Sequence, residues 1–306
     1  MILGTHPIAA IDVGSNAIRL LVGEVSKQGE LIYIEKIREP VRLGGDVFSE
    51  GKISSAIESK ALKAFKKFRK KMDQYAVDEV KAVATSAVRE AENGLEFVEE
   101  IKSKVGIEIE VIDAIQEAEL VQKAVDTKIN CLNKNVLIMD IGGGSVEFIY
   151  SESDKIKAVD SFPFGTVRSL KKSIKNSKSI KETLEELNPL LKNFFNTLPS
   201  PPDVFVGTGG NMVCMGYLRT QMFKKTNSQK IKRKELKTLI QELEKLSIQE
   251  RQMKFRLKPD RADVILPASY AVFQVMEALD MNEMLIPQVG LREGVLIATS
   301  EKYRSS

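Results

Sequence analysis

Two aspartates, Asp12 and Asp140, end the first strand-like run of a short pattern that the sequence contains twice. Each copy has an apolar run, a turn of small residues and a second apolar run, and the copies are IAAIDVGSNAIRLLV (8–22) and VLIMDIGGGSVEFIY (136–150). Turns of this kind expose backbone N–H groups that can hold phosphate oxygens, and the Asp can hold a hydrated divalent cation beside them. One copy is more typical of an ordinary turn. Two copies, one opening each half of the chain, indicate a duplicated domain with a phosphate clamp.

Polar side chains follow a further strand-like run that ends at Ala84. The segment ATSAVREA places Thr85, Ser86 and Arg89 at the C-terminal end of this strand, where ligands gather in open α/β sheets. Arg89 offers a planar fork for phosphate. A surface salt bridge to one of the neighbouring glutamates explains it equally well, and the segment leaves both interpretations open.

Two more segments have the same position relative to a predicted strand. DAIQEAEL (113–120) places Glu117 and Glu119 at a helix start, where acids commonly do no more than complement the helix dipole. VGTGGN (206–211) is a strand, a glycine-rich turn and a helix start, an arrangement that contacts phosphates. Alone, this glycine turn is weak support for a ligand site.

Composition limits the class of protein. At 306 residues with 43% hydrophobic and 29% charged residues, the chain predicts two domains with sizeable cores. Its two cysteines, Cys131 and Cys214, have no framework spacing, so we expect no disulfide scaffold and a reducing compartment. No secretory signal is recognisable, and no uncharged apolar run reaches the ~18 residues of a membrane helix. We therefore expect a cytoplasmic protein without membrane contact.

The net charge is only +4, but the basic residues are clustered. Residues 63–71 hold six Lys or Arg, residues 171–181 hold five, and residues 224–237 hold seven. Each cluster alone is typical of a solvated surface, whereas the three together favour a polyanionic ligand. The chain has no Trp and no DNA-binding motif, so a phosphate polymer is favoured over nucleic acid.

Hydrophobic periodicity predicts strands followed by alternating strand–helix units, with the order repeated in the second half, and so mixed sheets covered by helices. The predicted strands are Ile8–Val13, Ile18–Val25, Leu31–Ile37, Glu79–Ala84, Ile107–Ile112, Val136–Asp140, Val146–Tyr150, Ile156–Phe162 and Val204–Val206. The predicted helices are Ser54–Tyr75 with Ser54 or Ser55 as N-cap, Gly94–Val105, Gln116–Val125, Ala262–Leu279 as part of the core, and a last helix from about Gly290.

Seven motifs in register resemble the exopolyphosphatase / guanosine pentaphosphate phosphohydrolase (Ppx/GppA) family of the sugar kinase–heat shock–actin superfamily. They are DVGSN (12–16), TSAVREA (85–91), EAEL (117–120), DIGGGSVE (140–147), FPFGTVR (162–168), GTGGN (207–211) and GLREGVL (290–296). The resemblance implies an α/β fold of two RNase H-like (actin-like ATPase) domains, with mixed five-stranded sheets flanked by helices and facing each other across a cleft. It places domain I at 1–126, with the helix 291–306 packing back on it, and domain II at 127–290.

The resemblance also implies roles for single residues. Glu117 matches the general base that activates water, but Glu119 matches no functional position. The metal-associated carboxylates match Asp12, Asp140 and Glu147, with Mg²⁺ as the expected ion and Mn²⁺ as the alternative. The phosphate contacts match Ser15, Asn16, Arg89, Gly142, Gly143, Gly144, Ser145, Gly207, Gly209 and Gly210.

The sequence departs from the family pattern at three points. Pro287–Val289 replaces a segment that usually carries a polar contact, and Asn211 replaces a small hydroxyl residue. We also expect the appended C-terminal helical domains of long members to be absent. His6 is the only histidine, so a metal site built from several histidines is excluded.

Three functions are consistent with these observations. The favoured one is a phosphohydrolase that releases terminal phosphate from inorganic polyphosphate or guanosine pentaphosphate by Mg²⁺-assisted attack of a Glu-activated water. The second is a polyphosphate–nucleotide phosphotransferase of the same superfamily, and the third is a non-catalytic polyphosphate or nucleotide sensor. By resemblance, a homodimer is also expected.

Overall fold

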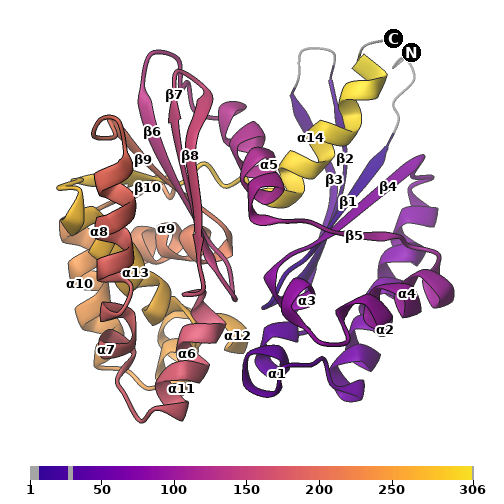
Figure 1. The fold of residues 1–306 in the computed structure, drawn as a ribbon, viewed down its shortest axis with the longest axis horizontal. Helices are drawn as coiled ribbons and strands as arrows, with labels where there is room; N and C mark the ends of the chain where they lie inside the picture. Colours follow the sequence, from indigo (N-terminus) through magenta and orange to yellow (C-terminus); the bar gives the residue numbers. More distant parts are fainter. Residues whose placement is uncertain (1–6, 27–29, 305–306) are drawn as a thin grey trace. The chain divides into compact units, whose positions relative to one another are not determined.

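The computed structural model describes residues 7–26 and 30–304, with side chains described up to residue 301, so His6 lies outside the described part (Figure 1). The chain divides into two compact units. Unit 1 comprises Met1–Lys128 and Val289–Ser306, and unit 2 comprises Ile129–Gln288. Each unit is built on one mixed sheet flanked by helices (Figure 1).

The sheet of unit 1 has five strands in the order β3-β2-β1-β4-β5. Strands β1 to β3 form an antiparallel meander, and β4 and β5 continue parallel to β1. The strands are β1 (Ile8–Val13), β2 (Ile18–Val25), β3 (Leu31–Glu39), β4 (Glu79–Ala84) and β5 (Ile109–Val111).

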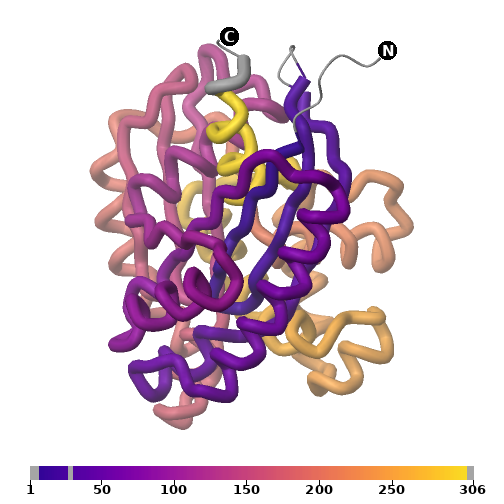
Figure 2. Tube along the Cα trace, turned by 90° about the vertical axis from the view of Figure 1, so that its right-hand side faces the viewer, coloured from indigo at the N-terminus to yellow at the C-terminus, as the bar shows by residue number. Residues whose placement is uncertain are grey.

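Helices cover both faces of this sheet. Alternate residues of β1 (Ala9, Ile11 and Val13) enter a core with α2, while α14 packs across β1 and β2 on the other face and runs beside α5. In Figure 2 the purple helical segments of this unit lie in front of its indigo strands. The helices are α1 (Leu43–Glu50), α2 (Ser55–Gln74), α3 (Ser86–Glu90), α4 (Gly94–Val105), α5 (Ala114–Asp126) and α14 (Leu291–Arg304).

The sheet of unit 2 repeats this plan with one strand more, in the order β10-β11-β9-β6-β7-β8. Again three strands form an antiparallel meander, and β9 and β11 continue parallel to the first of them. The strands are β6 (Asn135–Ile141), β7 (Val146–Glu152), β8 (Lys155–Phe162), β9 (Val204–Thr208), β10 (Lys230–Lys232) and β11 (Glu283–Leu285).

The core of unit 2 lies on the sheet face to which Leu137, Met139 and Phe148 point, and most helices of the unit contribute to it. The hydrophobic helix α13 buries most of its residues there, as predicted. The helices are α6 (Thr166–Lys175), α7 (Ile180–Glu185), α8 (Asn188–Thr197), α9 (Gly210–Phe223), α10 (Arg233–Glu244), α11 (Ile248–Phe255), α12 (Pro259–Ala262) and α13 (Ile265–Ala278).

The predicted fold class, two mixed sheets flanked by helices, is confirmed, and so is the Ser54 cap, which accepts from the Ile57 amide. The second sheet has six strands rather than five, because β10 adds to β11 at its edge. Both are three residues long, too short to show an alternating pattern. Helix α1 was also missed, since its two glycines disfavour a helix.

Within the described residues, no helix is long and apolar enough to cross a membrane.

Candidate active-site residues

In unit 1, Asp12 forms an ion pair with Arg19. The two residues are register partners in the β1–β2 hairpin, and the Arg19 Nη1 lies 2.5 Å from the Asp12 Oδ2. Asp12 is only 4% exposed. By strand alternation it points to the sheet face covered by α14 rather than to the core with α2. Arg19 was not singled out from the sequence, although its position opposite an Asp seven residues away is typical of a cross-strand pair.

The turn that follows Asp12 is buried and supported from two sides. The hydroxyls of Ser15 and Ser86 lie 3.0 Å apart in a buried hydrogen bond, which joins the turn to α3. The Gly44 amide donates to the Ser15 carbonyl at 2.8 Å, which joins it to α1. Asn16 is also buried. This part of the predicted phosphate site is therefore a fixed structure rather than a free loop.

Arg89 and Glu117 are brought together from different motifs. Arg89 lies at the end of α3, and its Nη1 donates to the Ile112 carbonyl at 2.7 Å and lies 3.9 Å from the Glu117 Oε2. The Arg89 side chain thus reaches the helix that bears the predicted base. Of the two sequence interpretations, the structure shows an ion pair, but with Glu117 instead of a neighbouring glutamate.

The two glutamates of helix α5 differ in how deeply they are buried. Its N-terminus is capped by Asp113 and Gln116 in a capping box, so the cap does not require Glu117. Glu117 is 7% exposed, whereas Glu119 is exposed to solvent. A buried carboxylate costs free energy unless it has a partner or a function, and Arg89 is a cation next to it.

In unit 2, Asp140 faces Glu147. These two residues are register partners in the β6–β7 hairpin, as Asp12 and Arg19 are in β1–β2. Both are buried, and the Ser161 hydroxyl donates to the Glu147 Oε1 at 3.0 Å. Two carboxylates directly opposite each other repel, and a cation bound beside them would lower this repulsion.

The glycine turn between β6 and β7 packs on the start of α6 through its carbonyls. The carbonyls of Gly142, Gly143 and Gly144 accept from the amides of residues 165–168, and Arg168 Nε donates to the Gly144 carbonyl at 2.6 Å. The N–H of a trans peptide points opposite to its C=O. The amides of residues 143–145 therefore point away from α6 and can hold phosphate oxygens.

Gly165 permits this close packing. A Cβ at this position would lie 2.3 Å from the Gly144 carbonyl carbon and 2.4 Å from that of Gly143. The FPFGTVR motif thus supports the turn through backbone contact, which the sequence alone did not indicate.

The third glycine segment joins β9 to α9 next to Asp140. Gly209 has φ +91°, and a Cβ there would lie 2.9 Å from the Asp140 Oδ1, so the backbone approaches this carboxylate closely. Gly210 begins α9, whereas Gly207 lies within β9 and packs against Met284. Of the three predicted glycines, Gly209 is thus the one beside a candidate metal ligand.

Arg261 is a residue that sequence reasoning missed. Its Nη1 donates to the Asn211 Oδ1 at 2.8 Å, and its guanidinium lies against Gly210. Asn211 in turn donates to the Thr166 hydroxyl at 3.4 Å. The Asn at this position, noted as a departure from the family pattern, therefore ties α9 to α6 and to α12.

Within the described part of the chain, no group of three or more His, Cys, Asp or Glu side chains is arranged to hold a metal ion. Two carboxylates are enough for Mg²⁺, because this ion is commonly bound by one or two carboxylates and otherwise by water and substrate phosphate oxygens. Asp140 and Glu147 fit this requirement. Asp12 is already neutralised by Arg19.

A family model, the Ppx/GppA phosphatase family, matches residues 22–303. The chain belongs to this family. It is 28% identical over 305 residues to the bifunctional 3-dehydroquinate synthase/phosphatase of Fusobacterium nucleatum, and the match covers 92% of this chain and 44% of that protein. It is 26% identical over 315 residues to the guanosine-5'-triphosphate,3'-diphosphate pyrophosphatase of Vibrio parahaemolyticus, covering 99% of this chain and 61% of that protein. The chain thus spans about half the length of these two relatives.

Solved structures match over nearly their whole length. The family member from Aquifex aeolicus is 27% identical with a TM-score of 0.81, covering 99% of this chain and 100% of that one. An exopolyphosphatase from Cytophaga hutchinsonii is 26% identical with a TM-score of 0.87, covering 97% of this chain and 98% of that one. These matches confirm the family resemblance seen in the sequence motifs.

Proposed function

We propose that this member of the Ppx/GppA family is a metal-dependent phosphohydrolase that releases terminal phosphate from inorganic polyphosphate or guanosine pentaphosphate. The observation that carries the proposal is the cross-strand pair of carboxylates, Asp140 and Glu147, next to a turn whose amides point away from α6. In this arrangement a cation and a phosphate can bind next to each other. The activity named for relatives, phosphatase or exopolyphosphatase, supports the same chemistry.

Hydrolysis of a phosphoanhydride needs charge neutralisation and an aligned water, with little covalent chemistry from the protein. In this proposal the amides of residues 143–145 bind phosphate oxygens, and Asp140 and Glu147 hold Mg²⁺. When bound, the ion neutralises charge on the phosphoryl oxygens. Ser15 and Asn16 are the phosphate contacts that unit 1 would supply, and Asp12 pairs with Arg19.

Glu117 acts as the general base in this proposal. Its carboxylate accepts a proton from the attacking water, and Arg89 holds the carboxylate in place and binds phosphate. Burial of Glu117, in contrast to the exposed Glu119, supports this assignment. A positioned base contributes typically ~10²–10⁴-fold to rate.

Polyphosphate is the favoured substrate. The structure described as an exopolyphosphatase is matched over 98% of its length, whereas the guanosine pentaphosphate relative is matched over 61%. The basic segments of the chain also favour a long polyanion, because their positive charge attracts it.

The test is phosphate release by purified protein with Mg²⁺, with long-chain polyphosphate and guanosine pentaphosphate assayed side by side. Glu117→Gln is compared with wild type and with Glu119→Gln, which makes the same change at an exposed position on the same helix. We expect kcat to fall about 10²–10⁴-fold in Glu117→Gln only.

Other results would select another function. Turnover that survives in Glu117→Gln would remove this residue as the base. Formation of nucleoside triphosphate from polyphosphate and ADP would favour the phosphotransferase. Tight binding without turnover, with Mg²⁺ and with Mn²⁺, would favour a sensor.

A further inference from the structure

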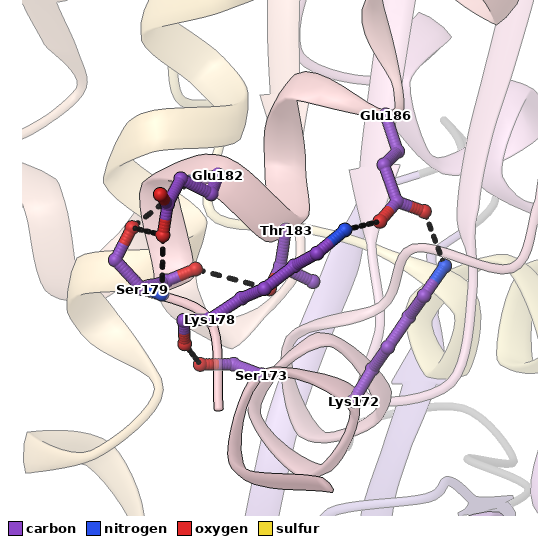
Figure 3. A network of polar contacts seen from close by, with 7 residues as sticks. All are labelled: Lys172, Ser173, Lys178, Ser179, Glu182, Thr183 and Glu186. Atoms are coloured by element: carbon purple, nitrogen blue, oxygen red, sulfur yellow. Dashed lines mark hydrogen bonds and ion pairs between the residues drawn. The ribbon is translucent and has the colours of Figure 1, made fainter. Parts of the chain in front are cut away.

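Some cations of each basic cluster pair with acids, and the clusters differ in how their unpaired lysines are arranged. In residues 171–181, Lys172 and Lys178 both pair with Glu186, at 2.5 and 3.1 Å, and Glu182 takes part in the adjacent capping network (Figure 3). In residues 224–237 the cations likewise meet acids: Arg233 pairs with Asp280 at 2.9 Å and Lys230 with Glu283 at 3.0 Å. Both clusters are thus partly neutralised by their own surroundings.

In helix α2, four lysines without an ion pair to any described residue lie along a single helix. No acid occurs between Glu58 and Asp73, over almost four helical turns. Lysines that form no ion pair with any described carboxylate line its solvent side, and all of them are exposed: Lys60, Lys63, Lys66 and Lys70. We call these four the α2 lysine row. At its edge, Lys67 pairs with Glu39 at 2.6 Å and Lys71 with Glu35 at 3.8 Å.

The α2 lysine row is held on a rigid support. The opposite side of α2 is buried in the core of unit 1 through Ala61, Ala64, Phe65, Phe68 and Met72. With spacings of three and four residues, the lysines stay on one side of the helix over ~15 Å. Like charges at this spacing repel, and a linear polyanion lying along the helix would relieve that repulsion at all four positions.

Chain topology places the row relative to the unit 1 turn. Strand β4 is parallel to β1 and follows α2, so α2 runs from the sheet edge with the Asp12 turn back to the opposite edge. At its start, the Ser54 hydroxyl donates to Asp46 of α1, and the Gly44 amide of α1 donates to the Ser15 carbonyl. Lys60 is therefore the end of the row nearer to Ser15.

We propose that the α2 lysine row is an accessory binding surface for linear polyphosphate, which retains long chains while the terminal phosphate is processed. The inference rests on the proposed function for its role in turnover, but binding can be measured without turnover. Nucleic acid is the poorer fit, because no aromatic side chain stands in the row for base stacking.

The experiment compares wild type with a variant in which all four lysines are changed to Gln. The matched control carries the same number of changes at scattered exposed lysines of unit 2: Lys134→Gln, Lys155→Gln, Lys157→Gln and Lys192→Gln. Affinity for long-chain polyphosphate is measured without divalent metal over a series of salt concentrations, and circular dichroism verifies that each variant is folded. Tripolyphosphate and single-stranded DNA are the comparison ligands.

In single-stranded nucleic acids each phosphate contact contributes about 0.7 to the slope of log K against log salt, and we take this value for polyphosphate. We therefore expect the slope for long polyphosphate to fall by about 3 in the α2 variant and by much less in the control. The ratio of the KM for long chains to that for tripolyphosphate should rise about tenfold.

Equal losses in both variants would overturn the proposal, because net charge alone would then explain binding. So would equal affinity of wild type for single-stranded DNA with a parallel loss in the α2 variant. If wild type binds polyphosphate through the row but releases no phosphate, the surface stands and the proposed hydrolase function fails. If wild type hydrolyses polyphosphate and the slopes of the two variants are alike, the proposed hydrolase function stands and the proposed binding surface fails.

Discussion

Asp140 lies opposite Glu147 in the β6–β7 hairpin at the register position where Asp12 lies opposite Arg19 in β1–β2. The duplicated hairpin therefore has two electrostatic forms. In unit 1 the pair is neutral by itself, with 2.5 Å between Arg19 Nη1 and Asp12 Oδ2. In unit 2 two buried carboxylates share one sheet face, which favours a bound cation. On this basis, binding of a divalent metal ion should depend more on the carboxylates of unit 2 than on those of unit 1.

Metal binding is expected to stabilise the fold through Asp140. At a Mg²⁺ concentration about ten times Kd, wild type should gain ~1.4 kcal/mol, which is ~3–5 °C in Tm. Asp140→Asn should lose most of this gain, because it removes one of two carboxylate ligands. Thermal unfolding with and without Mg²⁺ measures the effect. Asp160→Asn, an exposed position on β8, is the control and should keep the gain. An equal Mg²⁺ shift in Asp140→Asn would contradict the assignment.

Gly165→Ala is expected to disturb the glycine turn. Its Cβ would lie 2.3 Å from the Gly144 carbonyl carbon, so the turn or α6 must move. Overpacking of this kind costs about 1–3 kcal/mol, and phosphate affinity should fall with it. Gly45→Ala is the matched control, because nothing lies within 4 Å of its Cβ position and it sits inside α1. It should gain about 0.4–1 kcal/mol. Denaturant unfolding measures the free energy of unfolding of both variants. An unchanged value for Gly165→Ala would show that the close packing is not required.

The Ser15–Ser86 hydrogen bond should show as coupling between the two residues. Ser15→Ala leaves a buried hydroxyl without its partner, which costs about 1–3 kcal/mol. The double variant with Ser86→Ala should cost less than the sum of the single changes, since both polar groups are then gone. A second cycle with Ser103→Ala, an exposed position on α4, should be additive. Additivity of Ser15→Ala with Ser86→Ala would refute a structural link between the turn and α3.

Cys214 should react slowly with alkylating reagents. Burial raises the pKa of its thiol to about 11, with the Arg261 charge opposing the shift. The thiolate is the reactive form, so the rate should rise about tenfold per pH unit up to about pH 11. Arg261→Gln removes the opposing charge, which raises the pKa further and lowers the rate at every pH below it. Alkylation measured by mass spectrometry in a Cys131→Ser background tests this. A rate independent of pH between 7 and 9 would exclude control by this pKa.

Much of the fold could be predicted from local sequence. Strands β1, β2 and β4 and helix α4 end at the residues that periodicity indicated. What escaped prediction was short or contrary to propensity: β10 and β11 are three residues each, and α1 begins with two glycines after its first Leu. These elements form because of neighbours distant in sequence, such as the Ser15 carbonyl that accepts from Gly44.

The candidate site likewise has features that the sequence could predict and features that it could not. The sequence by itself determined where Asp12, Asp140 and the glycine turns lie, because an apolar strand, a turn and a second strand follow from a pattern within about fifteen residues. Only the tertiary structure decided that Arg89 meets Glu117, that Arg261 meets Asn211 and that the carbonyls of the turn bond to α6. The physical reason is that these contacts join residues that become neighbours only when helices pack on a sheet, and local periodicity contains no information about which side chains such packing brings together.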